Sequence, residues 1–218
     1  MTTDSTHHDG VPAPPPPQTL RPGRSSRLLF ESVLIVGSVA LGFLVTEWRE
    51  RAADRDLSHR ILTNVVAEIR ANREWVSGQI VAHNELIARF RSAPPATPDQ
   101  SGWDAITATL KAGPGVLPLR RAAWDAAVSS GALRLIDYDI AARLSEIYAF
   151  QDEGYGRASR SIGEALFVPD TFKPGTAREI ARMFQTMLTE IVGQETYVLE
   201  LYDRHLPALQ AQVSLTTQ

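Results

Sequence analysis

The stretch LLFESVLIVGSVALGFLV, residues 28–45, is an almost unbroken apolar run that carries one carboxylate, Glu31. A helix that crosses a bilayer needs about 20 apolar residues. The run supplies eighteen, and residues 46–48 can complete the crossing at the membrane interface, where tryptophan is favoured. A core helix of a soluble protein seldom has apolar residues on every face. The sequence therefore predicts a transmembrane helix over residues 28–48, with Trp48 as its interface anchor.

A secretory signal peptide is the main alternative for this run, because three arginines precede it. A signal peptide should end in a small-x-small cleavage site. The residues that follow the run read VTEW, which is a poor match to such a site. This favours an uncleaved signal-anchor.

One face of the predicted span combines small and polar residues. Glu31, Ile35, Ser38 and Gly42 recur at helical spacing and share this face. Ser38 and Gly42 form a small-xxx-small pair, which allows a second helix to approach closely. Glu31 either hydrogen-bonds a partner span or extends toward the lipid headgroups. We therefore expect these four residues to form a helix-packing face for dimerisation or for docking a partner.

The segment before the span, residues 1–27, contains VPAPPPPQTLRPG. Proline at this density favours an extended polyproline II conformation. The sequence predicts a disordered tail that acts as a spacer or as a docking ligand. Arginines flank both ends of the span in similar number, so the positive-inside rule does not decide the orientation.

Residues 49–218 show helical spacing and no alternating strand pattern. From residue 47 onward, apolar residues recur every three or four positions, with no proline before Pro94. One helix should therefore run from the span to about residue 91, with the polar residues Asn72 and His83 on its apolar seam. Further helices are expected over residues 103–112, 120–130, 137–166 and 177–213. The predicted seam of the last helix is Ile180, Phe184, Met187, Ile191, Val198, Tyr202, Leu206, Leu209 and Val213, with Gln194 in one slot. The fold class is all-α: a single transmembrane helix that continues into a long helix, with an extramembrane antiparallel helical bundle.

The composition argues against several kinds of chemistry. The chain has no cysteine, which excludes disulfides, thiolate metal sites and a cysteine nucleophile. Its net charge of -3 gives no basic excess for nucleic acid. His59, His83 and His205 lack the spacing of known metal sites, and no nucleophile elbow or P-loop is present. We expect no enzymatic activity, no catalytic residue, no cofactor and no metal.

Two segments carry a resemblance to a known group. They are ESVLIVGSVALGFLVTEWRERAADRDLSHRILTNVVAEIRAN, which begins at Glu31, and AAWDAAVSSGALRLIDYDIAARLSEIYAF, which begins at Ala122. Together they resemble an uncharacterised family of bacterial single-pass membrane proteins with an N-terminal span and a helical extramembrane domain. In the second segment the matching core positions include Trp124, Gly131, Leu133, Leu144 and Tyr148.

The resemblance implies a bacterial cytoplasmic (inner) membrane location, with a short cytoplasmic tail and the bundle on the periplasmic or extracytoplasmic side. It implies no reaction. The proline-rich tail departs from the long basic tail of that group.

Two functions are compatible with these features. The first is a membrane-anchored interaction or scaffold protein, or an accessory subunit of a cell-envelope complex. Its partners would be the lipid bilayer and either another protein or a second copy of the chain, bound through the span and the long helix. The alternative is a helical bundle that senses a small ligand between its helices.

Overall fold

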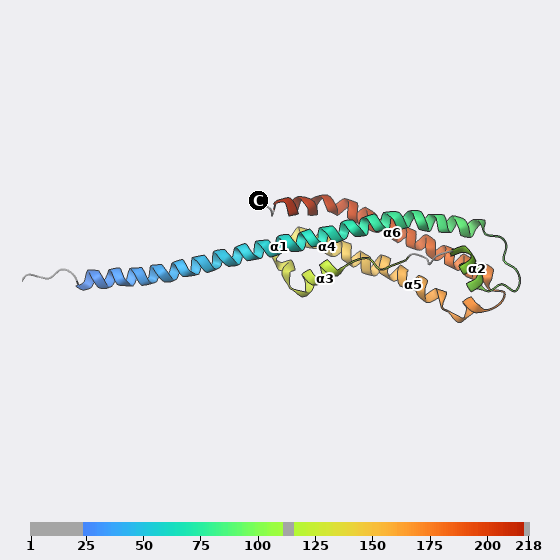
Figure 1. Ribbon diagram of the computed structural model, residues 1–218, viewed down its shortest axis with the longest axis horizontal. Coiled ribbons are helices and arrows are strands. Elements are labelled where there is room, and N and C mark those ends of the chain that lie inside the picture. The colour runs from blue at the N-terminus through green and yellow to red at the C-terminus, as the bar shows by residue number, and fades with distance from the viewer. Residues whose placement is uncertain (1–23, 111–115, 216–218) are drawn as a thin grey trace, which may run out of the picture. The chain divides into compact units, whose positions relative to one another are not determined.

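The apolar spacing after residue 47 produces one helix that also includes the predicted span. In a computed structural model, which describes residues 24–110 and 116–215, this helix is α1, Arg24–Ser92. Figure 1 shows the other elements along the chain. They are α2 (Gly102–Leu110), α3 (Ala122–Ser129), α4 (Tyr138–Phe150), α5 (Gly156–Leu166) and α6 (Ala177–Leu215), with short 3-10 turns at Ala132–Leu135 and Pro169–Phe172. No strand occurs in the described ranges, so the all-α prediction is confirmed.

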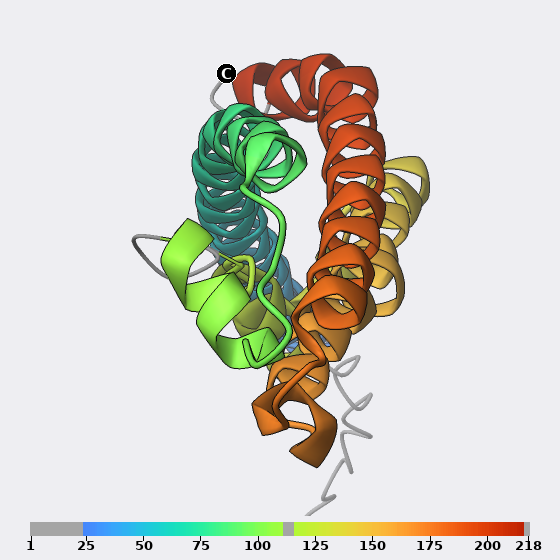
Figure 2. The same ribbon diagram turned by 90° about the vertical axis from the view of Figure 1, so that its right-hand side faces the viewer.

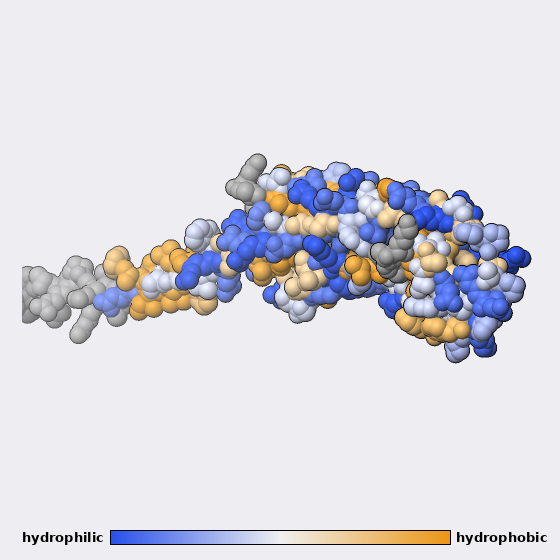
Figure 3. Space-filling model, turned by 45° about the vertical axis from the view of Figure 1, so that its right-hand side comes forward, coloured by the Kyte–Doolittle hydropathy of each residue, from blue (hydrophilic) through white to orange (hydrophobic). Residues whose placement is uncertain are grey.

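The chain divides into two compact units, residues 1–50 and 51–218. In the first unit, the described part is the beginning of α1; residues 1–23, most of the predicted tail, lie outside it. Its large apolar side chains from Phe30 to Val45 are all more than half exposed. They form the orange section of this segment in Figure 3. This segment is long and apolar enough to cross a membrane.

In the second unit, residues 51–92 of α1 pack against α4 and α6. Figure 1 shows α6 running in the opposite direction to α1 and to α4, and Figure 2 gives the end-on view of the three. The first core cluster includes Leu62, Val65, Ile69, Leu144, Ile147, Val198, Leu201 and Leu209, each at most 1% exposed. Burial of a leucine or isoleucine contributes about 1.5–3 kcal/mol, so this cluster is the main source of cohesion between the three helices.

A second core cluster joins α2 and α5 to α6 and to the end of α1. Its members include Leu86, Ile106, Tyr155, Ile162, Phe184, Leu188 and Ile191. Gly102 makes the closest approach between α2 and α6, because a Cβ added there would lie 2.5 Å from Cβ of Ile180. The absence of a side chain at Gly102 is therefore a packing requirement.

Helix ends follow their local sequence signals. Oγ of Ser101 accepts the backbone N–H of Asp104 at 3.2 Å and donates to the Asp104 carboxylate at 2.7 Å, which caps α2. The Asp137 carboxylate accepts the N–H groups of Asp139 and Ile140 at the start of α4. Gly131 has φ +67°, the left-handed conformation that ends α3. Serine and aspartate at an N-cap and glycine just after a helix end are the residue types that these positions favour.

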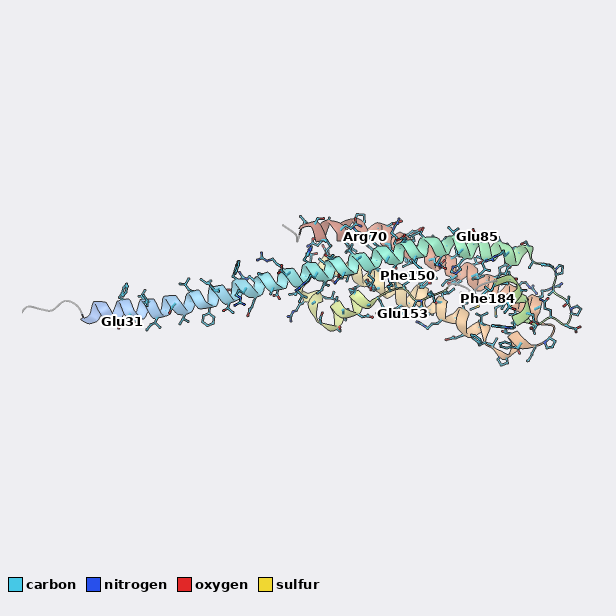
Figure 4. The ribbon with its side chains drawn as sticks, viewed as in Figure 1. Glu31, Arg70, Glu85, Phe150, Glu153 and Phe184 are labelled. Carbon is cyan, nitrogen blue, oxygen red and sulfur yellow. The ribbon has the colours of Figure 1, made fainter. Side chains whose placement is uncertain are left out.

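A π-helical turn, Gln151–Tyr155, joins α4 to α5. Gly154 lies in this turn, and Gly156 follows it. A Cβ on Gly154 would be 2.6 Å from the Phe150 ring and 2.8 Å from the Gln194 amide oxygen. Figure 4 labels Phe150 and Glu153 in this segment. The turn therefore packs closely on α6.

The buried face of α6 contains most of the predicted seam, but Met187, Gln194 and Val213 are only half-buried, and Ala177, Leu201 and His205 are buried in addition. Leu188 is fully buried where Met187 was expected, and Glu195 is fully buried where Gln194 was expected. Sequence hydropathy disfavours a charged residue in a core, since burial requires a partner. That partner is on α1, more than a hundred residues away. Pro207 lies inside α6, and Figure 2 shows the red C-terminal part of this helix changing direction.

Candidate functional site

The predicted helix-packing face lies on α1 within the first unit. Figure 4 labels Glu31 at its N-terminal end. The Ser38 hydroxyl donates to the carbonyl oxygen of Ile35 at 2.8 Å, so it is satisfied within the helix. A Cβ added to Gly42 would meet nothing within 4 Å, and the Trp48 side chain is 67% exposed. The face is thus a shallow strip of small residues that a second helix could pack against.

The second unit contains polar side chains in and beside its core, and the first group surrounds the half-buried Glu68. Its Oε2 accepts the N–H of Ala123 at 2.8 Å, and its Oε1 accepts the Tyr148 hydroxyl at 2.7 Å. The residue before α3, Arg121, supplies no side-chain cap. The carboxylate from α1 therefore caps α3, where the helix dipole favours a negative charge.

Tyr148 links this carboxylate to an aromatic stack. Its ring lies parallel to that of Trp124, with centroids 4.7 Å apart and 6° between the planes. Burial, reinforced by the hydrogen bond to Glu68, raises the pKa of the Tyr148 phenol well above its usual range. The hydroxyl therefore stays protonated and acts as a permanent donor to Glu68.

The family-like positions are structural in this fold. Trp124 and Tyr148 form the stack, Leu144 is fully buried, and Leu133 packs against the same cluster. Gly131 provides the left-handed turn described above. In this structure, the motif therefore consists of core residues and one turn residue.

Asn72 and Tyr155 hold the segment between α2 and α3. The Asn72 side chain donates to the carbonyl oxygen of Arg120 at 2.7 Å and accepts its N–H at 2.9 Å. The Tyr155 hydroxyl donates to the carbonyl oxygen of Leu117 at 2.9 Å. Both polar groups of the buried Asn72 side chain are thus hydrogen-bonded.

His83 and Glu195 form a buried pair between α1 and α6. Nδ1 of His83 lies 3.0 Å from the Glu195 carboxylate, and the two side chains are 2% and 0% exposed. Within the described residues, Oε1 of Glu195 has no hydrogen-bond partner. A carboxylate beside an imidazole is an acid–base arrangement. Both side chains are buried here, and the pair is a core contact between α1 and α6.

Two further polar contacts include buried side chains, and the second of them reaches the exposed Glu146. The buried Gln151 amide donates to the Tyr202 hydroxyl at 2.8 Å. Nε2 of His205 lies 3.0 Å from the Glu146 carboxylate. Among the side chains that the structure describes, no three histidines or carboxylates converge in a way that would hold a metal ion.

The bundle unit also has two sizeable surface cavities. One, of about 440 Å³, lies beside the π-helical turn and is lined by residues of α5 and α6, with acidic groups Glu153 and Glu190 at its edge. The other, of about 490 Å³, lies between the end of α1, the segment 93–100, α2 and the start of α6. Both volumes fall within the range typical of small-molecule sites.

Comparisons of the chain with protein-family models, with curated proteins and with solved structures found no match.

Sequence reasoning missed the buried residues Gln151 and Glu195 and the half-buried cap Glu68, because each is polar and follows no motif. The one available signal was the position of Gln151 and Glu195, each of which continues the apolar helical spacing of its neighbours.

Proposed function

We propose that this protein is a membrane-anchored helical interaction module, an accessory subunit of a bacterial cell-envelope complex. The supporting observation is the apolar segment of α1. Its large side chains from Phe30 to Val45 are exposed within the described part of the chain, although water would disfavour such an apolar surface. A bilayer and a partner helix would together cover it.

The bundle supports an interaction role rather than catalysis. Its buried titratable groups, such as His83 and Glu195, face one another instead of a solvent-filled cleft. In this proposal the span anchors the protein in the cytoplasmic membrane. The tail is cytoplasmic, and the bundle lies on the outer side of that membrane.

The helix-packing face can be tested directly. The full chain would be extracted in mild detergent, and its mass and co-purifying proteins would be measured. The double variant Ser38→Leu/Gly42→Leu should lose the partner or dissociate a homodimer, because leucine keeps the helices apart. The matched control, Ala40→Leu, makes the same kind of change on another face and should behave as the wild type. A wild-type chain that is strictly monomeric and alone would contradict the proposal.

The orientation can be tested because the natural chain has no cysteine. Ser5→Cys places a thiol in the tail, and Ser145→Cys places one on the exposed face of α4. In intact cells, a maleimide that cannot cross the cytoplasmic membrane should label the Ser145→Cys variant and spare Ser5→Cys. The reverse pattern would invert the proposed topology.

A second candidate function, a small-ligand sensor, is favoured by the 490 Å³ cavity at the start of α6. A ligand that binds only the folded chain raises the melting temperature by mass action. A panel of small molecules that leaves the melting temperature of the full-length chain unchanged would count against this function.

A further inference from the structure

The cavity at the start of α6 has an apolar floor built from small side chains. Small residues leave space between elements that would otherwise pack tightly. Together with the larger Phe90, those that line it include Pro94, Ala105, Ala108, Ala177 and Ala181. The first four lie on α1, the connecting segment and α2, and the two last alanines lie on α6. An apolar group of modest size therefore fits the floor.

Two arginines line the same cavity, and no acidic residue does. Arg178 and Arg182 are one turn apart on α6, and both are exposed. Several other arginines of the bundle have carboxylate partners, among them Arg73 with Asp203 and Arg121 with Asp152. In the described part of the chain, Arg178 and Arg182 form no ion pair; Nε of Arg182 donates to the carbonyl oxygen of Arg178 at 3.4 Å. Most of their donor groups are available to an anion.

The backbone at this helix start adds little to anion binding. The N–H of Ala177 donates to the carbonyl oxygen of Gln100, and those of Glu179 and Ile180 donate to the carbonyl oxygen of Thr176. A phosphate group with several acceptor oxygens usually recruits such amides. A planar carboxylate needs only the paired donors of a guanidinium.

We propose that this cavity binds a small organic acid, with its apolar body on the alanine and proline floor and its carboxylate on Arg178 and Arg182. This inference rests on the second proposed function, the ligand sensor, and names the chemical class of its ligand.

The test uses the full chain in phosphatidylcholine nanodiscs and titration calorimetry, with empty nanodiscs as the blank. The probes are phenylbutanoate, its neutral amide phenylbutanamide, and phenyl phosphate. Phenylbutanoate should bind, and the amide should bind about tenfold more weakly or not at all, because it loses the charge-assisted hydrogen bonds. Binding of phenyl phosphate more tightly than the carboxylate would overturn the carboxylate assignment.

Variants locate the site. Arg178→Gln/Arg182→Gln should weaken phenylbutanoate binding by about tenfold or more. The matched control Arg134→Gln/Arg160→Gln removes two exposed arginines that do not line the cavity and should leave the affinity unchanged. Ala181→Leu should block binding by filling the floor. Each variant's melting temperature should match the wild type, which separates loss of binding from loss of folding.

The outcomes separate this inference from the function on which it rests. Equal affinity for the acid and the amide, or an unchanged affinity in Arg178→Gln/Arg182→Gln, would refute anion recognition. If Ala181→Leu still abolished binding in that case, the cavity would remain a ligand site and the sensor function would survive. Absence of binding by all three probes would refute the proposed ligand class. Failure of the wider thermal panel as well would remove the sensor function.

Discussion

The Tyr148 hydroxyl donates a 2.7 Å hydrogen bond to Oε1 of Glu68, while Oε2 of the same carboxylate accepts the N–H of Ala123 at 2.8 Å. A single side chain on α1 thereby joins α3 and α4, which are separated from it by more than fifty residues. The contact shows how a small helix without a cap of its own is held in the bundle.

Glu68→Ala should destabilise the bundle by about 3 kcal/mol, because it leaves a partly buried hydroxyl and a helix N–H without acceptors. Glu68→Gln keeps one acceptor oxygen and should cost less, about 1 kcal/mol. Chemical denaturation followed by circular dichroism measures both. Glu85→Ala, an exposed change on the same helix, is the control and should have little effect. Equal stability of Glu68→Ala and Glu85→Ala would show that the contact contributes nothing.

The His83–Glu195 pair gives a second prediction. His83→Ala leaves a fully buried carboxylate without its partner and should cost about 3–5 kcal/mol. The double variant His83→Leu/Glu195→Met replaces the pair with apolar side chains and should recover most of that loss. Denaturation midpoints of the two variants test this. If the double variant were no more stable than His83→Ala, the two side chains would stabilise the fold through more than their contact with each other.

The approach of α2 to α6 predicts opposite effects at two glycines. Gly102→Ala places a Cβ against Ile180 and should destabilise the bundle by about 1–3 kcal/mol. Gly193→Ala, inside α6 with nothing within 4 Å of the added Cβ, should stabilise it by about 0.5–1 kcal/mol. Thermal melting of the two variants measures the difference. If Gly102→Ala left the melting temperature unchanged or raised it, the proposed close packing at Gly102 would be wrong.

Buried phenols predict loss of stability at alkaline pH. Burial raises the pKa values of Tyr148, Tyr155 and Tyr202 above their usual range. Above pH about 10 the unfolded chain releases these protons while the folded chain retains them, so the free energy of unfolding falls as pH rises. Below that pH both states are protonated, and these groups have no effect on the pH dependence.

An alkaline titration checks this sign. Tyrosinate absorbance from the buried phenols should appear together with the loss of helical circular dichroism. Tyr155→Phe should make the decline of stability less steep, whereas Tyr138→Phe, at an 83% exposed position, should leave it unchanged. A buried-phenol signal that appears before any unfolding would contradict the prediction.

The sequence was sufficient for the elements that depend on local rules. The helical spacing predicted α1 through residue 91 and the last helix over residues 177–213, close to the observed bounds of α1 and α6. Trp124, Leu133 and Tyr148 were identified as core positions, and in the structure they share one cluster in which the Trp124 and Tyr148 rings stack.

The parts that could not be predicted depend on partners distant in the sequence. Gln194 and Glu195 are adjacent, and hydropathy does not indicate which one faces the core. The choice is set by His83, which lies on another helix. The role of Glu68 was equally hard to predict, because its hydrogen-bond donors are a backbone N–H of α3 and a hydroxyl of α4. The cavity at the start of α6 likewise depends on four segments meeting, which no local pattern encodes.

The π-helical turn Gln151–Tyr155 has a consequence for length variation in this chain. An i to i+5 turn contains one residue more than an α-helical turn, so the turn is equivalent to a one-residue insertion within a helix from Tyr138 to Leu166. Deleting Gly154 should restore a regular α-helix and keep the inward face of α5. Deleting Gly163 should instead rotate Leu166 by about 100° away from the core. This helix should therefore tolerate the loss of one residue at the π-helical turn, but not the loss of one residue within α5 near Ile162.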